Sequence, residues 1–189
     1  MGASGIDDVV SLVRAAAATT GARRTVIVGI DGRAGSGKTT IAAAVARALG
    51  DCPIVHMDDI YPGWDGLAAS IPILVADILE PIAAGRPARF RRWDWAAAAP
   101  GAVREIPPPA TLVIEGVGSG ARPTAAFVDV PVWIDAPAQV RKQRALARDG
   151  EMFAANWDRW RDQEELLFTD DPVWERAAIV LDGTATDAR

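Results

Sequence analysis

The chain has 189 residues, of which half are hydrophobic, and this suits a single domain over residues 1–189 with a sizeable core. Its net charge of −5 argues against a nucleic-acid binder that works through a broad basic face. The single cysteine, Cys52, excludes a disulfide framework, and no run approaches the ~20 apolar residues of a membrane helix, so we expect a cytoplasmic protein without a membrane anchor.

Helices and strands alternate in the first part of the chain. Residues 6–18 have apolar positions at helical spacing, and residues 25–30 form a β-branched run typical of a strand buried on both faces. Residues 38–49 predict a second helix that ends at Gly50, and residues 53–56 predict a short second strand.

The middle of the chain is less regular. Residues 71–84 predict a helix with Ser70 as its N-cap and Gly85 at its end. Residues 86–109 leave two alternatives open, a hairpin of two strands or a segment that crosses the surface.

The last part of the chain returns to alternation. We expect strands over residues 111–115, 131–135 and 177–181, and two helices over residues 137–149 and 151–168 that are broken near Gly150. Alternating strands and helices imply a mostly parallel sheet with helices on both faces. The ligand of such a sheet lies beyond the carboxyl ends of its strands, so the loops after residues 30, 56, 115 and 135 should share one edge.

A phosphate-binding loop follows the first strand. Residues 32–39 match G-x-x-x-x-G-K-[ST] in full, between a predicted strand and a predicted helix. The glycines let successive backbone N–H groups point at phosphate oxygens, and the helix adds the positive end of its dipole. Lys38 is expected to reach the β- and γ-phosphates, and the Thr39 hydroxyl to ligate Mg²⁺. The residues that we expect to hold ATP here are Gly32, Arg33, Ala34, Gly35, Ser36, Gly37, Lys38, Thr39 and Thr40.

Several classes of nucleotide-binding protein share this loop. GTPases usually carry a guanine-reading N-K-x-D motif, and transporter ATPases carry a second signature, neither of which occurs in this chain. A kinase is therefore favoured, although the preference for ATP over GTP stays open.

Paired acids stand at the end of the second strand, in the sequence His56-Met57-Asp58-Asp59. An acid there faces the γ-phosphate and can accept the proton of an attacking hydroxyl, the role that we assign to Asp58. Asp59 is expected to orient the acceptor or to help hold Mg²⁺ through water. The alternative is a pair of solvated turn residues.

From this point the chain resembles the uridine kinase–like kinases, which include nicotinamide riboside kinases and phosphoribulokinases. Their second strand ends in Asp-Asp or Asp-Ser followed by two aromatic residues, and this chain has Asp58-Asp59-Ile60-Tyr61, with Ile60 in place of one aromatic. The resemblance implies an α/β P-loop NTPase sandwich of three layers with a small lid, and it implies that Asp58 is the catalytic base.

Two further segments carry the resemblance. Residues 112–116 look like the family's strand that ends in Glu-Gly, so Glu115 would be an outer-shell ligand of Mg²⁺ or of the acceptor. The alternative is a strand-end acid without a ligand. Residues 156–165 and 180–184 resemble nicotinamide riboside kinases, and the ordered motifs extend over residues 25–184.

An arginine row marks the expected lid, at about residues 141–156. Arg141, Arg144 and Arg148 are spaced i, i+3 and i+7, which puts them on one face of a helix where they can grip phosphate oxygens. Uridine kinases carry a similar row in their lid, and we expect Arg144 and Arg148 in catalysis and Arg141 and Arg144 at ATP. The chain departs from the family at Gly150-Glu151, so which arginine contacts ATP stays open, as does the alternative of an exposed ion-paired helix face.

The acceptor side is expected in residues 60–105. Flat rings from Trp64, Trp93 or Trp95 can stack a base, and Asp94 can bind ribose hydroxyls. Arginines at 89, 91 and 92 indicate instead an acceptor that already carries phosphate. The residues that we expect at the acceptor are Asp58, Asp59, Tyr61, Trp64, Arg92, Asp94 and Glu115.

The sequence thus predicts an enzyme that moves the γ-phosphate of Mg·ATP to a small-molecule acceptor, at the 5′-hydroxyl of a nucleoside of the uridine, cytidine or nicotinamide riboside type. Two alternatives stay open. One is a kinase for a sugar phosphate, pantothenate or a coenzyme precursor. The other is a non-catalytic ATP-binding regulator, which is consistent with Ile60 in the place of an aromatic residue. The oligomeric state also stays open.

Overall fold

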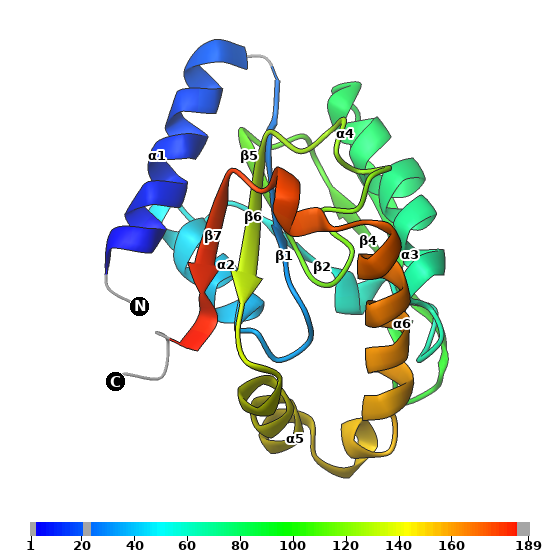
Figure 1. The fold of residues 1–189 in the computed structure, drawn as a ribbon. Helices are drawn as coiled ribbons and strands as arrows, with labels where there is room; N and C mark the ends of the chain where they lie inside the picture. Colours follow the sequence, from blue (N-terminus) through cyan, green and yellow to red (C-terminus); the bar gives the residue numbers. More distant parts are fainter. Residues whose placement is uncertain (1–2, 21–23, 185–189) are drawn as a thin grey trace.

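Five parallel strands form the central sheet of the computed structural model, which describes residues 3–20 and 24–184 (Figure 1). The strand order is β2-β5-β1-β6-β7. The strands are β1 (Val26–Asp31), β2 (Ile54–His56), β5 (Thr111–Glu115), β6 (Val130–Asp135) and β7 (Ile179–Asp182). The expected mostly parallel sheet is confirmed, and the carboxyl ends of its strands share one edge.

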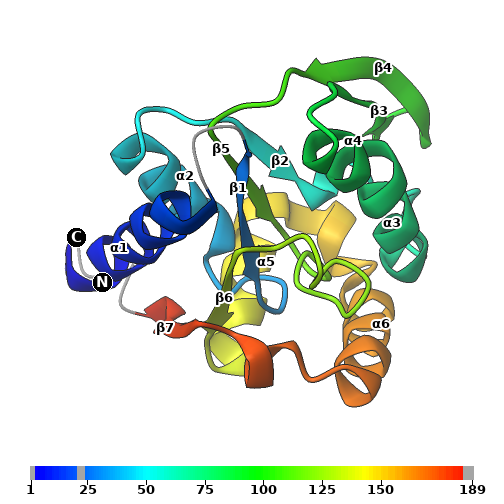
Figure 2. The same cartoon turned by 90° about the horizontal axis from the view of Figure 1, so that it is seen from above.

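Helices cover both faces of the sheet, as Figure 2 shows from above. One face carries α1 (Ala3–Thr20) and α2 (Lys38–Ala48), and the other carries α3 (Leu67–Ile73), α4 (Glu80–Ala83) and α6 (Trp157–Asp170). Side chains of β1 alternate between the two cores, since Val28 and Ile30 pack with the α1 and α2 side and Ile27 packs with the other. Burial on both faces is why β1 carries no polar side chain before Asp31 at its carboxyl end.

The helical segment after β2 differs from the prediction. A short 3₁₀ turn, η1 (Met57–Asp59), follows β2, and α3 then begins at Leu67 with Gly66 as its N-cap. The predicted N-cap, Ser70, lies inside α3, where its hydroxyl donates to the carbonyl of Leu67 at 2.7 Å. Pro72 has no N–H for the helical ladder, and a π-helical turn, η2 (Leu74–Leu79), follows before α4.

Residues 86–109 form the hairpin, which settles the alternative that the sequence left open. Strands β3 (Ala88–Asp94) and β4 (Ala99–Ile106) pair antiparallel, with a register shift between Arg91 and Trp93. The hairpin makes a separate two-stranded sheet beside β2 (Figure 2). It therefore has no hydrogen-bonded strand in common with the central sheet.

The lid segment leaves the carboxyl end of β6 and runs below the sheet in the view of Figure 1. Helix α5 (Ala138–Ala154) departs from helical geometry at Gly150, whose φ of 62° and ψ of −144° confirm the expected break. The second helix begins at Trp157 and not at residue 151 as predicted, because residues 151–154 continue α5 beyond the break. A 3₁₀ turn, η3 (Val173–Arg176), leads from α6 to β7. Within the described residues, no helix combines the length and hydrophobicity needed to span a membrane.

Candidate active site

The phosphate loop curls between β1 and α2 on three glycines with positive φ, namely Gly32 (150°), Gly35 (78°) and Gly37 (101°). A Cβ on Gly35 would stand 2.2 Å from the carbonyl oxygen of Arg141, so the loop packs directly against the start of α5. Lys38 is largely buried, and its Nζ donates to the carbonyl of Arg33 at 3.0 Å. This geometry holds the ammonium group over the loop.

The residues of the loop fit a nucleoside triphosphate. Ser36 Oγ is buried and finds no hydrogen-bond partner among the described residues. A buried hydroxyl without a partner is costly, and a bound phosphate oxygen would satisfy it. Together with Lys38 and the start of α2 at Lys38–Thr39, this hydroxyl makes a donor set suited to an anion.

Thr39 and Glu115 lie together, as the resemblance implied for a magnesium site. Thr39 Oγ1 donates to Glu115 Oε1 at 3.1 Å. A hydroxyl and a carboxylate are the hard oxygen ligands that Mg²⁺ takes, usually with phosphate oxygens and water completing the shell. No cluster of three or more His, Cys, Asp or Glu residues able to hold a metal occurs in the described part of the chain.

His56 is the second partner of Glu115. The two residues are register neighbours at the ends of β2 and β5, and His56 Nδ1 lies 2.6 Å from Glu115 Oε1. Burial opposes ionisation of Glu115, but the hydrogen bond with His56 and the charge of Lys38 outweigh burial and lower its pKa. The same hydrogen bond raises the pKa of His56. The carboxylate is therefore held in its charged form, as a metal ligand requires.

The paired acids are separated by the fold. Asp58 lines the pocket beside the phosphate loop. Asp59 is almost fully buried and forms ion pairs with Arg92 at 2.8 Å and with Arg104 at 3.6 Å, which tie η1 to the β3–β4 hairpin. Asp58 is thus the acid of the pair that faces the pocket.

A pocket of about 510 Å³ joins the phosphate loop to an aromatic wall. The aromatic wall consists of Tyr61, Trp64, Trp95, Phe153 and Trp160. The ring centres of Tyr61 and Trp160 lie 4.8 Å apart in an edge-to-face arrangement. The ring centre of Trp64 lies 4.9 Å from that of Trp95 and 5.5 Å from that of Phe153. These rings come from the loop after β2, the hairpin, α5 and α6. The sequence analysis predicted Tyr61, Trp64 and Trp95 here but missed Phe153 and Trp160, whose spacing alone is typical of core packing.

The three lid arginines do not share one environment. Arg148 lines the pocket. Arg141 is buried, and its guanidinium donates to the carbonyls of Ala136 at 3.0 Å and Ala34 at 3.3 Å. Arg144 donates to the carbonyl of Gly183 at 3.1 Å. In this conformation, therefore, only Arg148 of the three borders the space between the phosphate loop and the aromatic wall.

The predicted acceptor residues of the hairpin lie outside the pocket. Asp94 Oδ1 accepts the N–H groups of Ala96 and Ala97, each at 3.0 Å, so its carboxylate shapes the hairpin turn. Arg92 is paired with Asp59. The hairpin residue that lines the pocket is Trp95, whose indole N–H donates to the carbonyl of Asp58 at 2.9 Å.

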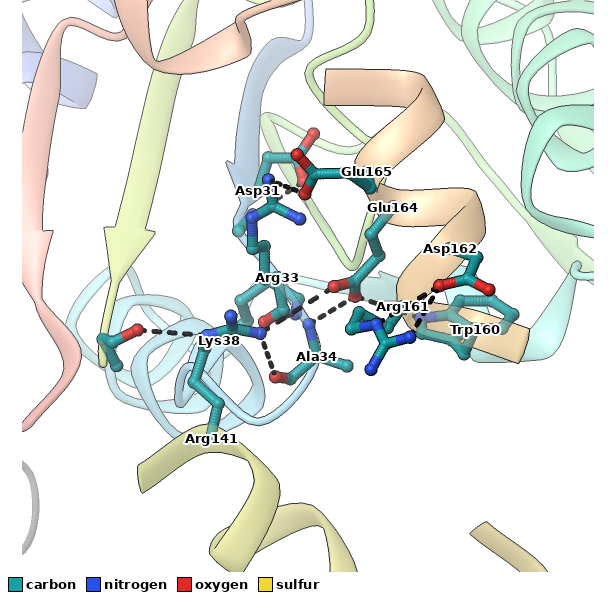
Figure 3. Close-up of polar contacts among 12 residues, drawn as sticks. Asp31, Arg33, Ala34, Lys38, Arg141, Trp160, Arg161, Asp162, Glu164 and Glu165 are labelled. Atoms are coloured by element: carbon teal, nitrogen blue, oxygen red, sulfur yellow. Dashed lines mark hydrogen bonds and ion pairs between the residues drawn. The ribbon is translucent and has the colours of Figure 1, made fainter. Parts of the chain in front are cut away.

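Two buried acids at the phosphate loop escaped the sequence prediction. Asp31 accepts the N–H groups of Gly32, Gly118 and Gly120 at 2.6, 3.1 and 2.8 Å, and burial raises its pKa to about 6 although these N–H groups act against the rise. Glu164, on α6, accepts the N–H of Ala34 at 2.6 Å (Figure 3). The position of Asp31 between a strand and the loop is a usable sequence signal, whereas Glu164 lies 130 residues from its partner.

The predicted site residues fall into two groups. Those that line the pocket are Ala34, Gly35, Lys38, Thr39, Asp58, Tyr61, Trp64, Glu115 and Arg148. Those outside its lining include Thr40, Asp59, Arg92, Asp94, Arg141 and Arg144. The phosphate loop, Asp58 of η1 and the aromatic side chains thus meet in one space.

Comparisons with known proteins identify the fold. No protein-family model and no curated protein sequence matches the chain. Among solved structures, a protein described as a possible uridine kinase from Bacillus stearothermophilus is 19% identical with a TM-score of 0.65, over 94% of this chain and 100% of that one. D-glycerate 3-kinase from Cryptococcus neoformans is 14% identical with a TM-score of 0.57, over 97% of each chain.

A third neighbour, shikimate kinase from Acinetobacter baumannii, is 15% identical with a TM-score of 0.50, over 84% of each chain. The neighbours are P-loop kinases, and the expected three-layer α/β fold is confirmed. At these identities the comparisons establish the fold and leave the reaction to the geometry of the site.

Proposed function

We propose that this protein is a cytoplasmic kinase that uses Mg·ATP to phosphorylate a hydroxyl group of a small molecule. The observation that carries the proposal is the shared pocket, because Lys38, Thr39 and Glu115 at the donor end and Asp58 beside them line the same 510 Å³ space as the aromatic wall. A donor loop, a carboxylate base and a separate wall for a second molecule are the parts that phosphoryl transfer needs.

In the proposed reaction, the acceptor hydroxyl gives its proton to Asp58 while its oxygen forms a bond to the γ-phosphorus. The bond from that phosphorus to the bridging oxygen breaks, and ADP leaves with the electron pair. Lys38 and Arg148, which both line the pocket, would stabilise the charge on the transferring group. Thr39 and Glu115 would hold Mg²⁺, whose chemical contribution is to neutralise charge on the phosphate oxygens.

For the acceptor we propose the 5′-hydroxyl of a nucleoside of the uridine, cytidine or nicotinamide riboside type. The support is the aromatic wall, since rings such as Trp64 and Trp95 can stack a flat base with a gain of ~1–3 kcal/mol per base. The structural neighbours are described as kinases of different acceptors, so the wall of this chain, and not the fold, is the basis for the choice.

An acceptor that already carries phosphate has less support. The arginines that suggested it, at 89, 91 and 92, do not line the pocket. Arg92 pairs with Asp59, and Arg91 donates to the carbonyl of Gly101. These contacts give the hairpin arginines a role in its structure.

The test is ADP release from Mg·ATP by the purified protein, with separate pools of nucleosides, nicotinamide riboside, pantothenate and sugar phosphates. We expect turnover with the nucleoside or riboside pool. Turnover with the sugar phosphates alone would overturn the proposed acceptor class. Binding of ATP without turnover in any pool would favour the non-catalytic regulator.

A further inference from the structure

Two residues of the phosphate loop, Arg33 and Ala34, contact α6, and Ala34 is separated from its partner Glu164 by 130 residues. Glu164 Oε1 accepts the N–H of Ala34 at 2.6 Å, and the next residue, Glu165, pairs with Arg33 at 3.0 Å. The guanidinium of Arg33 also lies 5.2 Å from the ring centre of Phe168 on the same helix. Two consecutive loop residues therefore depend on α6 for their positions (Figure 3).

Burying the carboxyl group of Glu164 at this position costs free energy. Its side chain is 1% exposed, and burial raises its pKa against the opposing effect of its hydrogen bond with Ala34. A buried carboxylate is tolerated only where donors surround it, and Trp160 Nε1 supplies another donor at 3.1 Å. Such a group can fix a geometry that an apolar side chain cannot fix.

The lid helix, α5, contacts the same loop residue, Ala34, through the following peptide group. Arg141, in the first turn of α5, donates to the carbonyl of Ala34 at 3.3 Å and lies 3.8 Å from Glu164 Oε2. Figure 3 shows Arg141 rising from α5 and Glu164 entering from α6, so that both converge on Ala34. The carbonyl and the N–H of one loop residue are thus held by the lid helix, α5, and by the helix that follows it, α6.

We propose that Glu164 is a positioning residue that sets the phosphate loop for the β-phosphate and, through Arg141, makes that geometry depend on the lid segment. The proposal rests on the proposed function only in that the loop must bind a nucleotide. The ammonium of Lys38 donates to Arg33, the neighbour of Ala34, so a shift of this segment would displace the lysine together with the loop. Loss of Glu164 should therefore lower the affinity for every nucleotide that places a phosphate in the loop.

The experiment measures binding of ADP and of ATP, each with Mg²⁺, by calorimetry. The proteins compared are the wild type, Glu164→Met, Glu164→Gln and, as a matched control on the exposed face of α6, Asp162→Asn. Glu164→Met should lower the affinities for ADP and for ATP equally, by about 10-fold, because the hydrogen bond from the loop to this carboxyl group is lost. Glu164→Gln keeps an acceptor for the N–H of Ala34 and should recover most of that loss, and Asp162→Asn should bind as the wild type does.

Hydrogen exchange and thermal unfolding separate positioning from general destabilisation. In folded Glu164→Met, the amide of Ala34 should exchange faster while β1 and α2 keep their protection. If Glu164→Met does not fold, the test uses Arg141→Lys, which removes the guanidinium from the carbonyl of Ala34. An equal loss of affinity for ADP and for ATP in this variant would support the positioning role. A loss confined to ATP would identify Arg141 as a γ-phosphate ligand and overturn the coupling.

The two proposals fail in different ways. Nucleotide binding by folded Glu164→Met that equals wild-type binding would overturn the role of Glu164 and leave the proposed kinase intact. A wild-type protein that binds neither ADP nor ATP would overturn both.

Discussion

The carboxylate of Asp31 accepts the N–H of Gly120 at 2.8 Å with its Oδ2, while its Oδ1 accepts the N–H of Gly32 at 2.6 Å. The end of β1 therefore joins the first glycine of the phosphate loop to the loop after β5. Gly116 and Val117 of that second loop line the pocket. Asp31 thus links the donor side of the site to the acceptor side without touching the pocket itself.

This buried acid predicts a pH dependence of stability. The pKa of Asp31 is about 6 in the folded protein against an ordinary value of 3.8, so between these values the folded state retains a proton that the unfolded chain releases. The free energy of unfolding should therefore fall as pH rises from about 4 to about 6, by roughly 3 kcal/mol, and this contribution should stay constant above that window. Across this range, urea unfolding should show the free energy of unfolding of the wild type falling relative to that of Asp31→Asn by about this amount. Asp162→Asn, at the surface of α6, should follow the wild type, and parallel curves for wild type and Asp31→Asn would contradict the prediction.

Asp58 and Asp59 should differ sharply in function although they are adjacent. Asp58→Asn removes the proposed base and should lower kcat by ~10²–10⁴-fold, with ATP affinity within about 2-fold of the wild type. Asp59→Asn disturbs the contacts with Arg92 and Arg104, so we expect it to act mainly on stability. Steady-state kinetics with the acceptor found in the screen, combined with calorimetry for ATP, make the comparison. Full activity in Asp58→Asn would remove the proposed mechanism.

Glu115 should set the magnesium requirement. Its carboxylate accepts the Thr39 hydroxyl at 3.1 Å, so Glu115→Gln takes charge from the place where the metal would bind. We expect the Mg²⁺ concentration for half-maximal activity to rise by about 10-fold. Binding of ADP measured in EDTA should change by less than about 2-fold, because it needs the loop and not the metal. An unchanged magnesium curve would place the metal elsewhere.

Trp95 should act on the acceptor alone. Trp95→Leu removes a ring that lies 4.9 Å from Trp64 at the edge of the pocket, together with the indole N–H bound to the carbonyl of Asp58. The KM for the acceptor should rise by about 10-fold, since stacking on one aromatic ring contributes ~1–3 kcal/mol. The KM for ATP should not move. Trp174→Leu, on η3 and outside the pocket lining, is the matched control, and equal effects of the two substitutions would contradict the assignment.

Two glycines with positive φ provide a test of the loop geometry. Gly35 has φ of 78° and a Cβ there would meet the carbonyl oxygen of Arg141 at 2.2 Å, whereas Gly85 has φ of 69° with open space around it. Gly35→Ala should therefore lower the affinity for ADP by roughly 100-fold or more, because the loop must change its conformation to make room for the Cβ. Gly85→Ala should cost about 1 kcal/mol of stability and leave ADP affinity unchanged. Calorimetry and thermal unfolding of the two variants make the comparison, and wild-type binding by Gly35→Ala would contradict it.

Features that depend on near neighbours in the chain follow directly from the amino-acid pattern. Strand periodicity placed the buried runs, and the eight residues from Gly32 to Thr39 contain both the glycines and the lysine of the phosphate loop. The rule that parallel strands share their carboxyl edge then placed Asp58 and Glu115 beside that loop. These predictions succeeded because local spacing and a single topological rule were enough.

The pairing of polar groups across long separations, in contrast, comes from the fold as a whole. Glu164 reaches Ala34 over 130 residues, Asp59 is drawn to Arg92 in place of the pocket, and Arg141 turns to the backbone of Ala34 although it shares a helix face with Arg148 in sequence spacing. Residue type shows that a side chain is polar, and its spacing in the sequence predicts the face of the helix or strand on which it lies. The partner that offsets the cost of burying it is set by packing of helices onto the sheet, which no local pattern records.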